Sequence, residues 1–424
     1  MIMRTHARQI AAWALYDFAD TPVSALYVTF FWPLYIKEHL GGNEFHVGLT
    51  MGLSLFFIAL TVPALGALSD AWGRRMPILI AATMLTAGTV ALTGYVGLFG
   101  ALVLGFLTRY FLTVDTDIYD AKLVDIVPRA RIGFVSGLGV GVGYLGTISA
   151  LLVAYPILNA LGWESLAAIR AMFWEGVAFL LIFSLPLFLL VKDLKKQVPE
   201  PNLTPGVKFG SGTGIIVRIV RKALDELKNT FGQMKKFDAL PRFLLASFVY
   251  NDAVNTTLIF LVLYAREVIG VSIEQFFLAF AIMAAGSAFG ALVFGRISDL
   301  LGPKKALSIA LVGWMFVVGY LLFSSTFRDL IIAGTVGGAM LGGIWTMNRH
   351  MITRITPYHK LAQVFGIEGL TERLSGVIGP VAFGALVIIF KDTPGMMFGY
   401  LPGLVLILAL LVAGFLLLQI VPKS

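Results

Sequence analysis

The stretch GALSDAWGRR (residues 66–75) recurs later in the chain as GRISDLLGPKK (residues 295–305). The two copies keep the same residue types at the same spacing: Gly66, Asp70 and Gly73 in the first, and Gly295, Asp299 and Gly302 in the second. A further pair of stretches, LYDFADT (residues 15–21) and VYNDAVNT (residues 249–256), is also alike. The chain is therefore predicted to consist of two related halves.

The composition around these repeats is that of a membrane protein. Hydrophobic residues make up 58% of the 424 residues and charged residues only 13%, whereas about 25% of residues are charged in soluble domains. Apolar runs of roughly 20 residues, the length that crosses a bilayer, recur along the chain. Twelve such segments are predicted, at residues 10–36, 47–68, 76–96, 98–126, 132–158, 170–191, 241–265, 273–295, 305–325, 329–349, 361–390 and 397–420.

The twelve segments form two six-helix halves, residues 1–191 and 241–424, separated by one long polar stretch at residues 192–240. Between Ile216 and Met234 of this linker, apolar residues recur at helical spacing among Lys and Arg. This pattern predicts an amphipathic helix on the membrane surface, and a solvated linker helix is the alternative. The predicted fold class is an all-α polytopic membrane protein with twelve transmembrane helices in two pseudo-symmetric halves.

The distribution of basic residues predicts how the chain crosses the membrane. Most of the 32 Lys and Arg residues fall in the termini, the central linker and the loops on the same side as the termini. Positively charged loops stay in the cytoplasm, so both termini are expected there, and a bacterial inner membrane is the expected location. The same rule explains the net charge of +8 without a nucleic-acid partner. The basic start MIMRTHARQI is interpreted as the beginning of a retained first span, not a cleaved signal peptide.

Several kinds of chemistry lack the residues to carry them. The chain has no cysteine, which excludes disulfides, thiolate catalysis and cysteine metal sites. It also lacks the His-Glu-x-x-His pattern of metalloproteases and a phosphate-binding P-loop, so no catalytic residue, metal, cofactor or ATP is expected. An intramembrane protease, suggested by Tyr16-Asp17 alone, and a channel are alternatives of another class. Neither accounts for the internal duplication, which an alternating-access transporter uses.

The motif Gly-x-Leu-Ser-Asp-x-x-Gly-Arg-Arg at residues 66–75 resembles the signature loop of the major facilitator superfamily. Three longer stretches resemble its vacuolar amino-acid effluxer branch: WALYDFAD (13–20), RIGFVSGLGVGVGYLG (131–146) and FLLASFVYNDAVNTTLIF (243–260). The resemblance implies a secondary active transporter that exports neutral or apolar amino acids, and the carboxylates inside its apolar segments lead us to expect proton coupling. Another small carboxylate, a sugar or a lysolipid-like amphiphile is an alternative cargo. The expected partners are the small solute, protons and membrane lipid, and a monomer is expected.

The repeated loops are the predicted gates of such a transporter. Their glycines allow close packing of helices and turn, and the basic residues at the end of the first loop can engage carboxylates on the cytoplasmic side. A cluster of this kind holds the halves together on one side and breaks when they open. The gating residues are predicted to be Gly66, Asp70, Gly73, Arg74, Arg75, Gly295, Asp299 and Gly302.

Charged and amide side chains inside the apolar segments are the candidate site residues, because such groups are costly in lipid and mark substrate or ion pathways. In the fold that the resemblance implies, the first, fourth and seventh segments line the central cavity and the eleventh borders it. The candidates for substrate binding and coupling are Asp17, Asp20, Arg109, Asp115, Asn251, Asp252, Asn255, Glu368, Glu372 and Arg373.

Roles can be assigned to several of these residues as hypotheses. Asp252 is predicted to be unpaired, since its own helix carries no cation near its depth, and it is the first candidate for proton coupling or for binding a substrate amine. Arg109 is the candidate for a bidentate contact with a substrate carboxylate. Arg373 is the second, with Glu368 or Glu372 as its neutralising partner. For Asp17, Asp20 and Arg109, a purely structural, neutralising cluster is the alternative.

Overall fold

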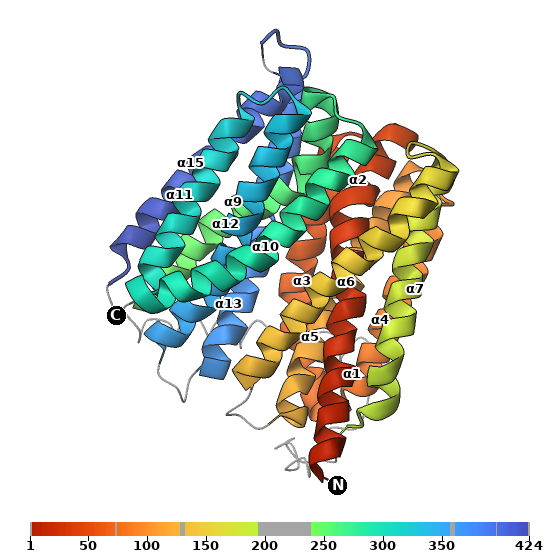
Figure 1. The fold of residues 1–424 in the computed structure, drawn as a ribbon, viewed down its shortest axis with the longest axis vertical. Helices are drawn as coiled ribbons and strands as arrows, with labels where there is room; N and C mark the ends of the chain where they lie inside the picture. Colours follow the sequence, from red (N-terminus) through yellow and green to blue (C-terminus); the bar gives the residue numbers. More distant parts are fainter. Residues whose placement is uncertain are drawn as a thin grey trace, which may run out of the picture.

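The computed structural model describes residues 2–72, 74–127, 132–193, 239–356, 361–395 and 397–422. Every regular element in these ranges is a helix (Figure 1). Gly73 and most of the linker, on which the predicted amphipathic helix falls, lie outside the described residues. In chain order the elements are α1 (Ile2–Pro22), η1 (Val23–Phe31), α2 (Trp32–Leu34), η2 (Tyr35–His39), α3 (Glu44–Trp72), α4 (Met76–Thr93), α5 (Leu98–Ile126), α6 (Ile132–Leu161), α7 (Leu166–Leu190), α9 (Ala239–Tyr264), η4 (Ala265–Ile269), α10 (Ile273–Leu301), α11 (Pro303–Leu321), α12 (Phe327–Ile355), α13 (Leu361–Ser375), α14 (Ile378–Phe390), η6 (Met397–Gly399) and α15 (Tyr400–Ile420).

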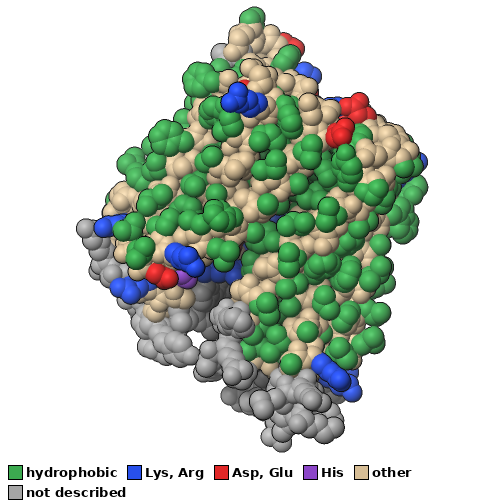
Figure 2. Space-filling model, viewed as in Figure 1, with side chains coloured by type: hydrophobic (Ala, Val, Ile, Leu, Met, Phe, Trp, Pro, Cys, Tyr) green, Lys and Arg blue, Asp and Glu red, His purple; other side chains and the backbone are tan. Residues whose placement is uncertain are grey.

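These helices make twelve passes through the bundle, which confirms the predicted fold class. Within the described ranges, 11 helical segments are long and apolar enough to cross a membrane. The remaining pass is the first, in which helical structure continues from α1 through η2 and includes Asp17 and Asp20. Figure 2 shows hydrophobic side chains over the middle of one face and charged ones toward its two ends. Both chain ends lie toward the same, lower end of the bundle in Figure 1.

The first pass of each half contains π-helical geometry that the sequence did not indicate. In the first half η1 and η2 are π-helical, and in the second half η4 continues α9 in the same way. The η2 and η4 segments end the first and the seventh passes at the same end of the bundle. Because π-helical turns are rare and occur often at functional sites, we expect the first and seventh passes to take part in function.

Glycine allows neighbouring helices to approach closely in this bundle. A Cβ atom on Gly342 of α12 would lie 2.0 Å from the backbone oxygen of Ser287 on α10. Likewise, a Cβ atom on Gly146 of α6 would lie 2.3 Å from the backbone oxygen of Phe18 on α1. Lipid offers no hydrophobic drive for helices to associate, so small residues at contacts of this kind support packing in a membrane.

The eleventh pass is broken, although one continuous segment at residues 361–390 was predicted. The helix α13 ends at Ser375 and α14 begins at Ile378. Beyond the break, α14 packs against α3 of the first half so closely that a Cβ atom on Gly48 would lie 2.1 Å from the backbone oxygen of Pro380. Both parts of the broken pass contact α9 of their own half and α3 of the first half.

Candidate functional site

The break in the eleventh pass presents a helix N-terminus to Asp252 on α9. The backbone N–H of Gly379 donates to Asp252 Oδ1 at 2.9 Å, and the Asp252 side chain is buried. A helix N-terminus favours a negative charge, so Asp252 has a backbone partner that the sequence did not indicate, and its predicted role in coupling or amine binding stays a prediction. Glycine is required at position 379, because a Cβ atom there would lie 2.2 Å from Thr256 Oγ1 and 2.7 Å from Asp252 Oδ1.

The two asparagines beside Asp252 face different neighbours. Asn251 accepts a long hydrogen bond, 3.4 Å, from the Asn348 amide on α12, and Asn348 in turn accepts from the Tyr250 hydroxyl at 2.6 Å. The Asn255 amide lies at the break, where a Cβ atom on Gly376 would be 3.7 Å from its nitrogen. The predicted residues of the seventh pass therefore join α9 to α12 and to the broken eleventh pass.

In the first half, two buried carboxylates meet at one hydroxyl group. Thr116 Oγ1 lies 3.1 Å from Asp20 Oδ2 and 3.4 Å from Asp115 Oδ1. The same hydroxyl makes its shortest hydrogen bond, 2.7 Å, to the backbone oxygen of Leu112. Since a hydroxyl has one hydrogen, this arrangement has more acceptors than donors. Asp20 Oδ1 is buried without any hydrogen-bond partner, so a proton on this pair would supply a donor that the surroundings lack.

Asp115 is buried more deeply than Asp20 and has two more hydroxyls near it, those of Thr86 and Tyr16. Its side chain has no exposed surface, and Thr86 Oγ1 on α4 lies 3.3 Å from Asp115 Oδ2. Thr86 also bonds the backbone oxygen of Ala82 at 3.0 Å, so it too shares its only hydrogen. The carboxylate pair is thus enclosed by hydroxyl-bearing side chains of α4 and α5 and by α1.

The basic candidates are placed differently from the predicted pairs. Arg373 on α13 forms an ion pair with Asp117 on α5, across the two halves. This differs from the predicted neutralisation by Glu368 or Glu372, because adjacent helical residues such as 372 and 373 do not face each other, and Glu372 is exposed. The Arg373–Asp117 pair joins the halves on the α13 side of the break.

Arg109 and Asp17 do not form the neutralising cluster of the structural alternative. Among the described residues, Arg109 makes no ion pair with Asp17 or Asp20, although its charge acts on Asp20 and Glu372. Asp17 packs against α6, where a Cβ atom on Gly139 would lie 2.5 Å from Asp17 Oδ2. The Arg349 charge from α12 acts on Asp17 and on Glu368.

The repeated loops have unequal contacts. Arg75 Nη1 donates to the backbone oxygen of Ala121 at 2.8 Å and pairs with Asp125 at 3.4 Å, so it binds α5 within its own half. Arg74 and Asp299 are exposed. Gly295 lies in α10, and Gly302 joins α10 to α11 with a φ of +83° that favours glycine. Gly66 and Asp70 lie in α3, and their side chains are outside the described residues, as is Gly73. The gating role of these loops stays a prediction.

At the opposite end of the bundle, sequence reasoning missed a reciprocal set of ion pairs. Lys37 of η2 pairs with Glu267 of η4, and Arg266 of η4 pairs with Glu38 of η2 at 2.7 Å. The dipeptides Lys37-Glu38 and Arg266-Glu267 have the same offset as Gly66 and Gly295, so that offset was the available signal. A self-complementary contact of this kind is what a two-fold relation between halves produces.

Two further buried carboxylates were also missed, one at this end of the bundle and one inside the first half. Glu44 of α3 pairs with Lys37 and accepts a hydrogen bond from the Tyr400 hydroxyl of the last pass. Glu175 of α7 is buried, and neither of its carboxylate oxygens has a hydrogen-bond partner. Its signal in the sequence was a lone acid inside an apolar run.

Known proteins resemble this chain in sequence and in fold. The model of the family described as "Vacuole effluxer Atg22 like" matches residues 127–424. The uncharacterized MFS-type transporter YxiO of Bacillus subtilis (strain 168) is 22% identical over 442 residues, covering 100% of this chain and 97% of that protein. The multi-drug resistance efflux pump PmrA of Streptococcus pneumoniae serotype 4 is 24% identical over 86% of each chain.

The crystal structure of a mutant form of the nucleoside transporter NupG has the same fold, with a TM-score of 0.75 at 14% identity, over 98% of this chain and 100% of that one. These proteins are transporters and not enzymes. This chain is accordingly a multi-pass membrane transporter of the major facilitator type, and it belongs to the Atg22-like vacuole effluxer family.

Proposed function

We propose that this protein exports neutral, apolar amino acids across a bacterial inner membrane, that protons drive the export, and that the Asp20–Asp115 pair carries the proton. The family match and the resemblance of the first-half and seventh-pass motifs support an effluxer. The observation that carries the coupling proposal is the donor deficit around Asp20 and Asp115, where one hydroxyl faces both carboxylates and one oxygen has no partner. Paired carboxylates can share a single proton.

The ion pairs at one end of the bundle support alternating access. Lys37–Glu267 and Arg266–Glu38 connect the ends of the first and seventh passes and hold the two halves together there. A cycle that opens this end breaks both pairs at once, because the two are related by the repeat. Proton binding at Asp20–Asp115 and solute binding in the cavity then supply the differential free energy between the two states.

Asp252 has a different role in this proposal. Its carboxylate is bonded to the N-terminus of α14, which stabilises the charged form, so it positions the broken eleventh pass. Asn251 and Asn255 lie on the same helix and remain the candidates for contact with a zwitterionic solute. Arg109 remains the candidate for the solute carboxylate.

Counterflow of labelled leucine in proteoliposomes tests the cargo, and an imposed pH gradient tests the coupling. The expected results are saturable exchange of leucine and, when a pH gradient is imposed, accumulation of leucine against its own concentration gradient. A protein that binds no leucine, by thermal shift and by counterflow, removes amino acids as cargo. If leucine transport does not respond to the pH gradient, proton coupling is contradicted, whereas leucine remains the cargo.

A further inference from the structure

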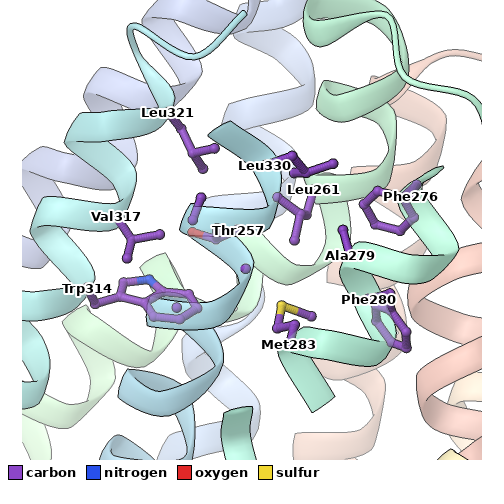
Figure 3. Close-up of a pocket in the computed structure, with 13 residues that line it drawn as sticks. Thr257, Leu261, Phe276, Ala279, Phe280, Met283, Trp314, Val317, Leu321 and Leu330 are labelled. Atoms are coloured by element: carbon purple, nitrogen blue, oxygen red, sulfur yellow. The ribbon is translucent and has the colours of Figure 1, made fainter. Parts of the chain in front are cut away.

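A small cavity lies within the second half, between α9, α10, α11 and α12. Figure 3 shows Thr257, Trp314, Val317 and Met283 around it. Its free volume is about 20 Å³, which is enough for one water-sized group. All of its lining residues are apolar except Thr257 and the indole nitrogen of Trp314.

The cavity contains one unused donor and one unused acceptor. Trp314 Nε1 is buried with no hydrogen-bond partner, and the whole side chain is 2% exposed. Thr257 uses its hydrogen on the backbone oxygen of Ala253 at 2.8 Å, which leaves its oxygen as an acceptor. A buried N–H without a partner is unfavourable. A single group that satisfies both positions must accept from Trp314 and donate to Thr257, as the hydroxyl of a ligand or a water molecule does.

A larger groove adjoins this cavity on the lipid-facing side. Its volume is about 700 Å³, within the range of small-molecule sites. It lies between α11 and α12, and Val317 and Ala333 line both the groove and the cavity. The groove continues to Tyr320 and Phe323, at the α11–α12 turn.

The opposite wall of the cavity faces the first half. Phe276 and Phe280 of α10 line the cavity, and their rings lie 4.9 Å and 5.7 Å from the ring of Phe30 in η1. The cavity therefore lies between the lipid-facing groove and the first pass. A molecule in the groove has its inner end next to the helices that form the interface between halves.

We propose that the groove and cavity form one binding site for an apolar solute that carries a single hydroxyl group and enters from the membrane. The apolar body occupies the groove, and the hydroxyl inserts between Val317 and Ala333 to bond Trp314 and Thr257. A phospholipid fits these groups poorly, because its head group stays at the interface and its acyl chain offers neither donor nor acceptor at the depth of Trp314. The site does not depend on the cargo proposed above.

Scintillation proximity binding of tritiated farnesol to the purified full-length protein in detergent tests this site. Saturable binding is expected, with farnesene, the hydrocarbon without the hydroxyl, competing at least tenfold more weakly. The Trp314→Phe variant keeps a ring and removes the N–H, and its affinity for farnesol is expected to fall about tenfold. Trp345→Phe on α12, which is 39% exposed and lines neither space, is the matched control and keeps the wild-type affinity.

A second pair of variants tests the groove without changing the core. Val336 lines the groove and is 41% exposed, and Val336→Phe is expected to abolish binding by filling it. Leu292→Phe, on the exposed face of α10, leaves binding unchanged. Equal affinity for farnesene and farnesol, or wild-type affinity in Trp314→Phe, overturns the proposal. Competition by lysophosphatidylcholine that is equally strong in wild type and Trp314→Phe also overturns it and assigns the groove to a lipid chain.

Discussion

Asp20 lies on the first pass of one half and Asp252 on the first pass of the other, but their surroundings differ. Asp252 has the backbone N–H of Gly379 at 2.9 Å, at the start of α14. Asp20 has one oxygen without any partner and shares a hydroxyl with a second carboxylate, Asp115. The duplication supplied similar helices, and the halves then diverged in what each carboxylate is bonded to.

The difference indicates a division of roles. A carboxylate that accepts a hydrogen bond from a helix N-terminus has a donor that favours its charged form, and the bond connects the two elements. A carboxylate pair with too few hydrogen-bond donors can gain the missing donor by binding a proton or a solute amine. Coupling is therefore expected from the first half and structural support from the second.

The largest expected effect separates the two carboxylates in transport. In Asp20→Asn, gradient-driven leucine export is expected to fall roughly 5- to 150-fold, the usual range of a coupling free energy, because an amide cannot take up the proton. Counterflow, which needs no net proton movement, is expected to persist. Asp252→Asn is the matched comparison and should keep its response to the pH gradient. Loss of gradient response in Asp252→Asn alone would return the coupling role to the second half.

The next effect tests whether Asp252 is structural. Gly379→Ala places a Cβ atom 2.2 Å from Thr256 Oγ1 and 2.7 Å from Asp252 Oδ1, and overpacking of this kind costs about 1–3 kcal/mol. The melting temperature of the purified protein is expected to fall. Gly319→Ala on α11, where a Cβ atom would meet nothing within 4 Å, is the control and should not destabilise. Equal melting temperatures for the two variants would show that the contact at Gly379 is loose.

The smallest effect concerns the contact in which the two halves remain alike. Glu38→Arg alone is expected to favour opening of the ion-paired end by about 1 kcal/mol, the upper value for partly exposed pairs. Adding Arg266→Glu should reverse part of this shift, since the pair with residue 38 is rebuilt with its charges exchanged while the pair of Arg266 with Glu164 is lost. The chain has no cysteine, so labelling of Asn255→Cys by an impermeant maleimide from that end reports the opening.

Lys391→Glu provides the control for the charge exchange. Lys391 is exposed in the turn after α14, so changing its sign should leave labelling unaltered. If the double variant labels as fast as Glu38→Arg alone, the Arg266–Glu38 pair does not hold this end closed.

Much of the architecture could be predicted from the sequence because the bilayer restricts it so strongly. Apolar runs must become helices where no water satisfies the backbone, so the twelve passes could be predicted from the apolar runs, including the first, which contains Asp17 and Asp20. The repeat between residues 66–75 and 295–305 indicated paired halves, and the charged residues inside the runs marked the helices that matter. These inferences depend on local composition and spacing, which a sequence contains directly.

The partners of those charged residues were decided only by the tertiary structure. Nothing near Asp252 in the chain indicates that residue 379 would supply its partner, since that contact requires the break between Ser375 and Ile378. The pairing of Arg373 with Asp117 likewise joins two passes from different halves. Sequence sets which groups are placed in the membrane, whereas packing of distant helices sets which of them are satisfied. The hydrogen-bond partners that helix packing supplies are what distinguish Asp20 from Asp252.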